Sequence, residues 1–204
     1  MWLSENRRVP LPGAFRIIAK YELAPKATAP RGLSEGTHPP PLMTSDEQNW
    51  EPQTCYLKPA ELVVCQFPTR ITTVLGTCVA VCLFDPVTKI GGMNHYMLPR
   101  RGEGVAFSLK YGDMAIATLI DKMVKAGAVE KELRAKVFGG LEGAFSLFRI
   151  GYRNTEVAID LLKKRKITID TLDVGGVRSR KIIFCSWNHQ VIGNFLENEI
   201  YAKK

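Results

Sequence analysis

Cys78 and His95 lie in one stretch of the chain, residues 75–99, and their side chains together suit nucleophilic acyl chemistry. A cysteine thiolate attacks a carbonyl carbon, and a nearby imidazole takes the thiol proton and returns it to the leaving group. The chemistry requires the two side chains to meet in space. The elements around them must therefore bring both to one place.

The intervening residues predict two adjacent strands. Residues 79–84 are apolar and rich in β-branched side chains, Asp85 and Pro86 begin a turn, and residues 90–98 resume a strand-like pattern. Such a hairpin would place Cys78 and His95 near the same end of a sheet. The structural alternative is ordinary burial, because Cys behaves as a small apolar residue and a single His is often structural.

The other four cysteines carry no such signal. Cys82 lies in the middle of an apolar strand and is expected in the core. Cys55, Cys65 and Cys185 have no Cys-x-x-Cys spacing, and no Cys/His cluster predicts zinc. An odd number of scattered cysteines fits a reducing cytoplasm better than a disulfide framework.

Several blocks of sequence, in order, resemble the CheD family of chemoreceptor glutamine deamidases of bacterial chemotaxis. The resemblance covers about two thirds of the chain, from about residue 56 to residue 192. The blocks are LGTCVAV at 75–81, GGMNHYMLP at 91–99, YGD at 111–113, AKVFGG at 135–140, IGYRN at 150–154, DVGG at 173–176 and RKI at 180–182. Departures from the family pattern occur at Ser179, at Asn188-His189 and in residues 141–145.

The resemblance implies three catalytic residues: Cys78, His95 and Thr72. Cys78 is then the nucleophile, His95 raises its thiolate fraction and protonates the departing ammonia, and Thr72 orients the imidazole. The spacing in the family favours Thr72, whereas chemistry alone leaves the adjacent Thr73 open. Backbone N–H groups near Cys78 are the expected oxyanion donors.

The implied activity is hydrolysis of selected Gln side chains on methyl-accepting chemotaxis receptors to Glu, through a thioester and without a metal or organic cofactor. The phosphatase CheC is an implied partner. Two alternatives stay open. One is an adaptor that binds receptor or CheC with weak or dispensable catalysis, and the other is a thiol acyl-transferase that uses an amine in place of water.

Composition predicts a cytoplasmic protein. The chain has 204 residues, 46% of them hydrophobic, and no apolar run near the ~20 residues of a membrane span. The net charge of +8 raises nucleic-acid binding as an alternative. However, the densest run, residues 163–166, ends a predicted helix and has no aromatic platform beside it. A positive surface also suits an acidic protein partner.

The chain is expected to form one α+β domain at residues 55–193, between a flexible Pro-rich extension (1–54) and a tail (194–204). Strands are predicted around 62–65, 71–74, 79–84, 90–98, 135–140, 167–172 and 181–187. Helices are predicted from Ser108 to about 126 and from an Asn154 N-cap to about 166. Family resemblance implies stacked mixed β-sheets flanked by helices, with a cysteine-hydrolase type of site.

Two acidic residues and one further histidine are expected to have no functional role. Asp170 and Asp173 lack a third ligand at useful spacing, so solvated turn carboxylates are expected rather than a metal site. His189 lies in a polar turn beside Trp187, where it could join the active site in space, but a position in a surface loop is expected.

Overall fold

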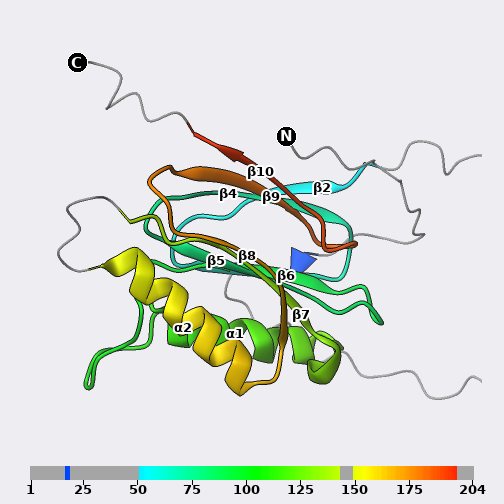
Figure 1. The fold of residues 1–204 in the computed structure, drawn as a ribbon. Coiled ribbons are helices and arrows are strands. Elements are labelled where there is room, and N and C mark those ends of the chain that lie inside the picture. The colour runs from blue at the N-terminus through cyan, green and yellow to red at the C-terminus, as the bar shows by residue number, and fades with distance from the viewer. Residues whose placement is uncertain (1–16, 19–50, 143–148, 197–204) are drawn as a thin grey trace, which may run out of the picture.

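The computed structural model of the protein describes residues 17–18, 51–142 and 149–196. Within these residues the fold is α+β, with two stacked sheets and helices on one side (Figure 1), which confirms the expected class. Most of the expected N-terminal extension and C-terminal tail lies outside the described residues. No helix in the described part of the chain is long and apolar enough to cross a membrane.

The larger sheet has six strands, and β8 is parallel to β7 while the other neighbouring pairs are antiparallel. In spatial order its strands are β1 (Ile17–Ile18), β3 (Glu61–Cys65), β6 (Gly91–His95), β5 (Val79–Phe84), β7 (Arg134–Gly139) and β8 (Thr168–Val174).

The smaller sheet has four strands, with β2 parallel to β4 and the other pairs antiparallel. Their order is β10 (Val191–Phe195), β9 (Arg180–Cys185), β4 (Thr69–Leu75) and β2 (Gln53–Tyr56). The expected boundaries at 55 and 193 fall inside β2 and β10, because both strands are paired beyond those positions. Both strands therefore continue across the residues at which the domain was expected to begin and end.

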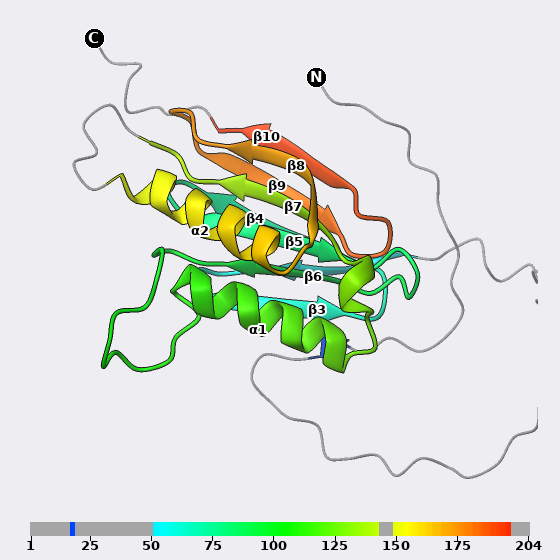
Figure 2. The same ribbon diagram turned by 60° about the horizontal axis from the view of Figure 1, so that its bottom comes forward.

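Helices α1 (Gly112–Lys125) and α2 (Ile150–Lys164) cover one face of the six-stranded sheet, and the smaller sheet packs on its other face (Figures 1 and 2). A short 3₁₀ turn, η2 (Glu130–Glu132), leads into β7. Strand β5 is buried at every position because both of its faces are covered. This sandwiched strand lies between the core under the helices and the core between the sheets.

Both helices begin at residues other than those predicted. Helix α1 begins at Gly112 rather than near Ser108, because Tyr111 has an extended backbone that forms a β-bridge with Leu98. Helix α2 begins at Ile150, after Arg149 in a left-handed conformation (φ 45°). Asn154 is therefore inside the helix and is not its N-cap.

Candidate active site

The expected site residues lie between the two sheets, where strand alternation directs their side chains. His95 follows Met93 by two positions on β6, and Met93 belongs to the core between the sheets. On β4 of the facing sheet, Thr73 lies between Ile71 and Leu75, which belong to the same core. His95 and Thr73 therefore approach each other from opposite sheets.

A short hydrogen-bond chain fixes the imidazole. Oγ1 of Thr73 lies 2.8 Å from Nδ1 of His95 and 2.8 Å from the carbonyl oxygen of Leu57. The Leu57 carbonyl can only accept, so the Thr73 hydroxyl donates to it and accepts from Nδ1–H of His95. Nε2 then carries the lone pair. It is buried and has no hydrogen-bond partner among the described residues, which leaves it available as a base.

Cys78 precedes β5 and reaches the same inter-sheet face. Val79 and Tyr96 exchange two backbone hydrogen bonds of 3.1 and 3.0 Å, which set the register beside the site. In that register Cys78 is a diagonal neighbour of His95 on one face of the sheet. Its half-buried side chain packs against the core between the sheets. The hairpin predicted from sequence thus brings the thiol and imidazole to one end of the sheet.

The structure gives Thr73 the histidine contact that the family spacing gave to Thr72. Successive side chains of a strand point to opposite faces, so only one of two adjacent threonines can face the other sheet. Thr73 is fully buried and faces His95, while Thr72 is half-buried and accepts a backbone bond from the Leu57 N–H through its carbonyl. The hydroxyl that contacts His95 is therefore that of Thr73.

The backbone around Cys78 is held by the glycine turn after β7. The N–H of Gly140 donates to the Cys78 carbonyl (2.8 Å), and the N–H of Leu141 donates to the Gly76 carbonyl (2.9 Å). Gly139 has φ +111°, and a Cβ there would lie 2.2 Å from the Cys78 carbonyl oxygen. Within the described part of the chain, the Cys78 N–H donates to no carbonyl oxygen. It interacts with the residue's own thiol, the position beside which an oxyanion would form during acyl transfer.

Asn154 is a site-supporting residue that the sequence prediction had assigned to a helix cap. Its side-chain amide donates to the carbonyl oxygens of Thr77 (2.9 Å) and Met97 (3.0 Å). Its own backbone carbonyl accepts the Tyr96 hydroxyl (2.7 Å). One fully buried helix residue thus ties together the segments that carry Cys78 and His95. The sequence signal that pointed to Asn154 was the IGYRN block at residues 150–154. The position of Asn154 inside α2, and not at its start, was decided by packing.

Burial favours the neutral forms of both reactive groups. It raises the pKa of the Cys78 thiol, an effect partly offset by that residue's own backbone N–H. Burial also lowers the pKa of His95 to about 4, against smaller opposing effects from the Leu57 carbonyl and Glu61. Near neutral pH the resting pair is therefore thiol and neutral imidazole. A neutral imidazole can accept the proton of a neighbouring thiol as the sulfur attacks a carbonyl carbon.

The remaining cysteines have structural positions. Cys65, Cys82 and Cys185 are buried, and burial raises the pKa of each thiol, most strongly that of Cys82. Cys55 is half-buried on β2. The burial of Cys82 confirms the core position predicted for it.

The two turn carboxylates and His189 differ from expectation. Asp170 pairs with Arg134, and Asp173 accepts a 2.6 Å bond from Arg180, so both carboxylates are paired with arginines. His189 is only 8% exposed and stacks on Phe84 with ring centroids 5.4 Å apart. It lies by the Phe84 end of β5, whereas Cys78 precedes the other end. The structure therefore does not bring His189 to the site.

Comparison with known proteins shows which family the chain belongs to. Residues 97–194 match the family described as "CheD chemotactic sensory transduction". A relative in Anaeromyxobacter dehalogenans (strain 2CP-C), "Probable chemoreceptor glutamine deamidase CheD 1", is 46% identical over 132 residues, covering 63% of this chain and 77% of that protein. A "Probable chemoreceptor glutamine deamidase CheD" of Stenotrophomonas maltophilia (strain K279a) is 39% identical, and the match covers 74% of this chain and 77% of that protein. A protein of the same name in Thiobacillus denitrificans (strain ATCC 25259 / T1) is also 39% identical, with 68% of this chain and 71% of that protein covered. The chain belongs to the CheD family.

Proposed function

We propose that this protein is a chemoreceptor glutamine deamidase that uses Cys78 as nucleophile, His95 as general base and acid, and Thr73 to orient His95. The observation that carries the proposal is the buried Thr73–His95 hydrogen bond beside Cys78 in a chain of this family. It fixes the tautomer in which Nε2 can take a proton. The same role for a third group is seen in other catalytic triads.

The first half of the reaction forms a thioester. Nε2 of His95 takes the Cys78 proton as the sulfur attacks the carbon of a Gln side-chain amide. The amide oxygen becomes an oxyanion, and the backbone N–H of Cys78 donates to it. The C–N bond then breaks, the His95 proton passes to the leaving nitrogen, and ammonia departs.

The second half hydrolyses the thioester. A water molecule loses a proton to Nε2 of His95 as its oxygen attacks the thioester carbon. The C–S bond breaks, the sulfur recovers the proton from His95, and a Glu side chain replaces the Gln. The net change is addition of water and release of ammonia, and its steps use only the residues already described.

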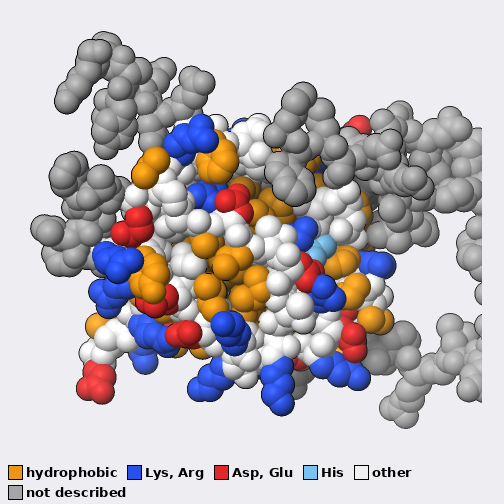
Figure 3. Space-filling model, in the orientation of Figure 1, with side chains coloured by type: hydrophobic (Ala, Val, Ile, Leu, Met, Phe, Trp, Pro, Cys, Tyr) orange, Lys and Arg blue, Asp and Glu red, His pale blue; other side chains and the backbone are white. Residues whose placement is uncertain are grey.

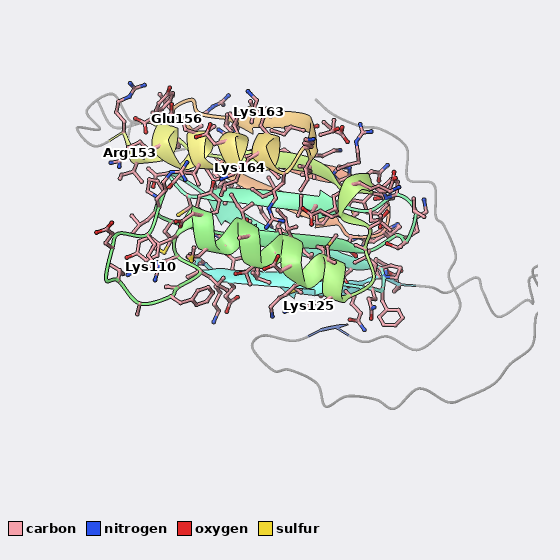
Figure 4. The ribbon with its side chains drawn as sticks, turned by 90° about the horizontal axis from the view of Figure 1, so that it is seen from below. Lys110, Lys125, Arg153, Glu156, Lys163 and Lys164 are labelled. Carbon is pink, nitrogen blue, oxygen red and sulfur yellow. The ribbon has the colours of Figure 1, made fainter. Side chains whose placement is uncertain are left out.

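The helix side of the protein supports an acidic protein partner. Lys and Arg side chains gather along this side in Figure 3, and Figure 4 shows the labelled cations on and beside α1 and α2. Helix α2 exposes Arg153, Lys163 and Lys164 with Glu156 among them, and α1 exposes Lys125. Long-range attraction to an acidic surface follows from such a distribution. The proposed partners are the cytoplasmic region of methyl-accepting chemotaxis receptors and CheC, which places the protein in the cytoplasm.

Mass spectrometry of a chemoreceptor cytoplasmic fragment tests the activity directly. The fragment is incubated with the parent protein, with Cys78→Ala, or with Cys55→Ala, a control at another half-buried cysteine. Gln-to-Glu conversion is expected with the parent and Cys55→Ala and is expected to be lost with Cys78→Ala. Binding without conversion by the folded parent would favour the adaptor, and amine adducts after addition of a primary amine would favour a transferase.

A further inference from the structure

Glu61 is a carboxylate placed directly beside the reactive histidine by strand pairing. In the ladder between β3 and β6, Glu61 is the partner of His95. Directly opposite residues of an antiparallel pair share one face and have Cβ atoms about 4.5–5.5 Å apart. Val63 and Cys65, two and four positions along β3, belong to the core between the sheets. Alternation therefore directs Glu61 to the inter-sheet face that His95 occupies.

The backbone next to Glu61 is also fixed to His95. The N–H of Ala60 donates to the His95 carbonyl (2.8 Å), and Ala60 has a left-handed conformation with φ 62°. Oε2 of Glu61 accepts the Lys58 N–H at 2.9 Å, which closes the turn before β3. The carboxylate is thus held at the edge of the site by its own strand and by the turn.

A charge near His95 matters because the imidazole becomes positive during the reaction. His95 is 2% exposed, so water cannot solvate the imidazolium that forms when it takes the Cys78 proton. In a Ser-His-Asp triad a carboxylate accepts from Nδ1, but here Nδ1 bonds the neutral hydroxyl of Thr73. Thr73 fixes the tautomer without supplying charge.

We propose that Glu61 is a positioning residue of this site, whose carboxylate stabilises the imidazolium of His95 from the neighbouring strand. This assignment rests on the proposed deamidase function. Among the described elements around His95, the facing groups able to carry charge are Glu61 on β3 and the thiols of Cys78 and Cys82 at β5. The facing group on β4 is Thr73, and Lys58 is exposed. The negative charge of Glu61 also opposes the lowering of the His95 pKa by burial.

The test replaces Glu61 by Gln, which keeps the side-chain size and an oxygen for the Lys58 N–H but removes the charge. We expect the pKa of His95, followed by NMR on the full chain, to fall by about one unit. We expect kcat for receptor deamidation to fall about tenfold, as one pKa unit implies, with KM unchanged. Glu61→Asp, which retains the charge on the same strand, should restore most of both values.

A second neutral variant, Glu61→Ala, separates charge from turn structure. Equal falls in His95 pKa for the Gln and Ala variants support the charge. If the His95 pKa falls in the Ala variant but not in the Gln variant, the effect belongs to the Lys58 turn and the proposal is overturned. An unchanged His95 pKa in both variants also overturns it. The titration requires no receptor. If the protein were not a deamidase, the parent protein would convert no Gln to Glu in the receptor assay. The titration would still show whether the pKa of His95 responds to Glu61.

Discussion

The Thr73 hydroxyl joins the two sheets at the reactive histidine, because it lies within 2.8 Å of both Nδ1 of His95 and the Leu57 carbonyl. His95 belongs to the six-stranded sheet and Thr73 to the four-stranded sheet. The position of His95, the proposed general base, thus depends on how the two sheets pack. The tautomer of His95 depends on the Thr73 hydroxyl, which donates its own proton to the Leu57 carbonyl.

Thr73→Val and Thr72→Val form a matched pair that tests this contact. Both changes keep a β-branched side chain in β4, but only the first removes the hydroxyl at His95. Loss of a buried hydrogen bond worth about 1–3 kcal/mol corresponds to a fall of about 5- to 150-fold in rate. We expect such a fall in kcat/KM for Thr73→Val and less than about a twofold change for Thr72→Val. The reverse order would return the orienting role to Thr72.

Alkylation kinetics should report a thiol that is accessible but not preionised. Iodoacetamide is expected to modify Cys78 well before the buried Cys82, as followed by peptide mass spectrometry. Because burial raises the pKa of Cys78 above its ordinary value of 9.0, its rate should still increase as the pH passes 9. Cys78→Ser provides the control for assignment. A rate for Cys78 that levels off near pH 7 would show a stabilised thiolate and contradict the neutral resting pair.

The burial of His95 and His189 predicts that the free energy of unfolding depends on pH. The pKa values of His95 and His189 are lowered to about 4, from an ordinary value of 6.5, chiefly by burial. Between these values the unfolded chain binds protons that the folded protein does not bind. Their contribution is therefore favourable above pH 6.5 and is lost progressively as the pH falls from 6.5 towards 4.

His189→Asn isolates one of these two contributions. Asn tolerates the left-handed backbone of this position (φ 62°) and does not titrate in this range. Urea unfolding at pH 7 and pH 5 should show a smaller loss of unfolding free energy in the variant than in the parent. Loss of stacking on Phe84 should lower its stability at both pH values. An identical pH-dependent loss in both proteins would exclude His189 as a contributor.

Asn154→Ala should damage both stability and catalysis. The change removes the two hydrogen bonds that the Asn154 side-chain amide donates, and it leaves the carbonyls of Thr77 and Met97 without that donor. We expect a loss of about 1–3 kcal/mol in the free energy of unfolding. We also expect a fall in kcat, since the segments carrying Cys78 and His95 lose their shared anchor. Asn194→Ala, at an exposed position on β10, is the control and should change neither value appreciably. Equal behaviour of the two variants would remove Asn154 from the site.

The sequence by itself determined the local elements and the chemistry. The apolar run at 79–84 and the Asp85 turn follow from short-range patterns, and both appear in the structure. Motif order was sufficient to identify the family and to select Cys78 and His95. These properties depend on residue type and spacing along the chain, which a single sequence contains.

Tertiary packing decided the remaining features, because they depend on contacts between distant segments. Only the stacking of two sheets shows that Thr73, and not Thr72, meets His95. Only the docking of α2 makes Asn154 an anchor for Thr77 and Met97 instead of a cap. Burial is likewise a property of the folded protein, and it keeps Cys78 and His95 neutral at rest. The pairing of β3 with β6 then places the Glu61 charge where the imidazolium forms.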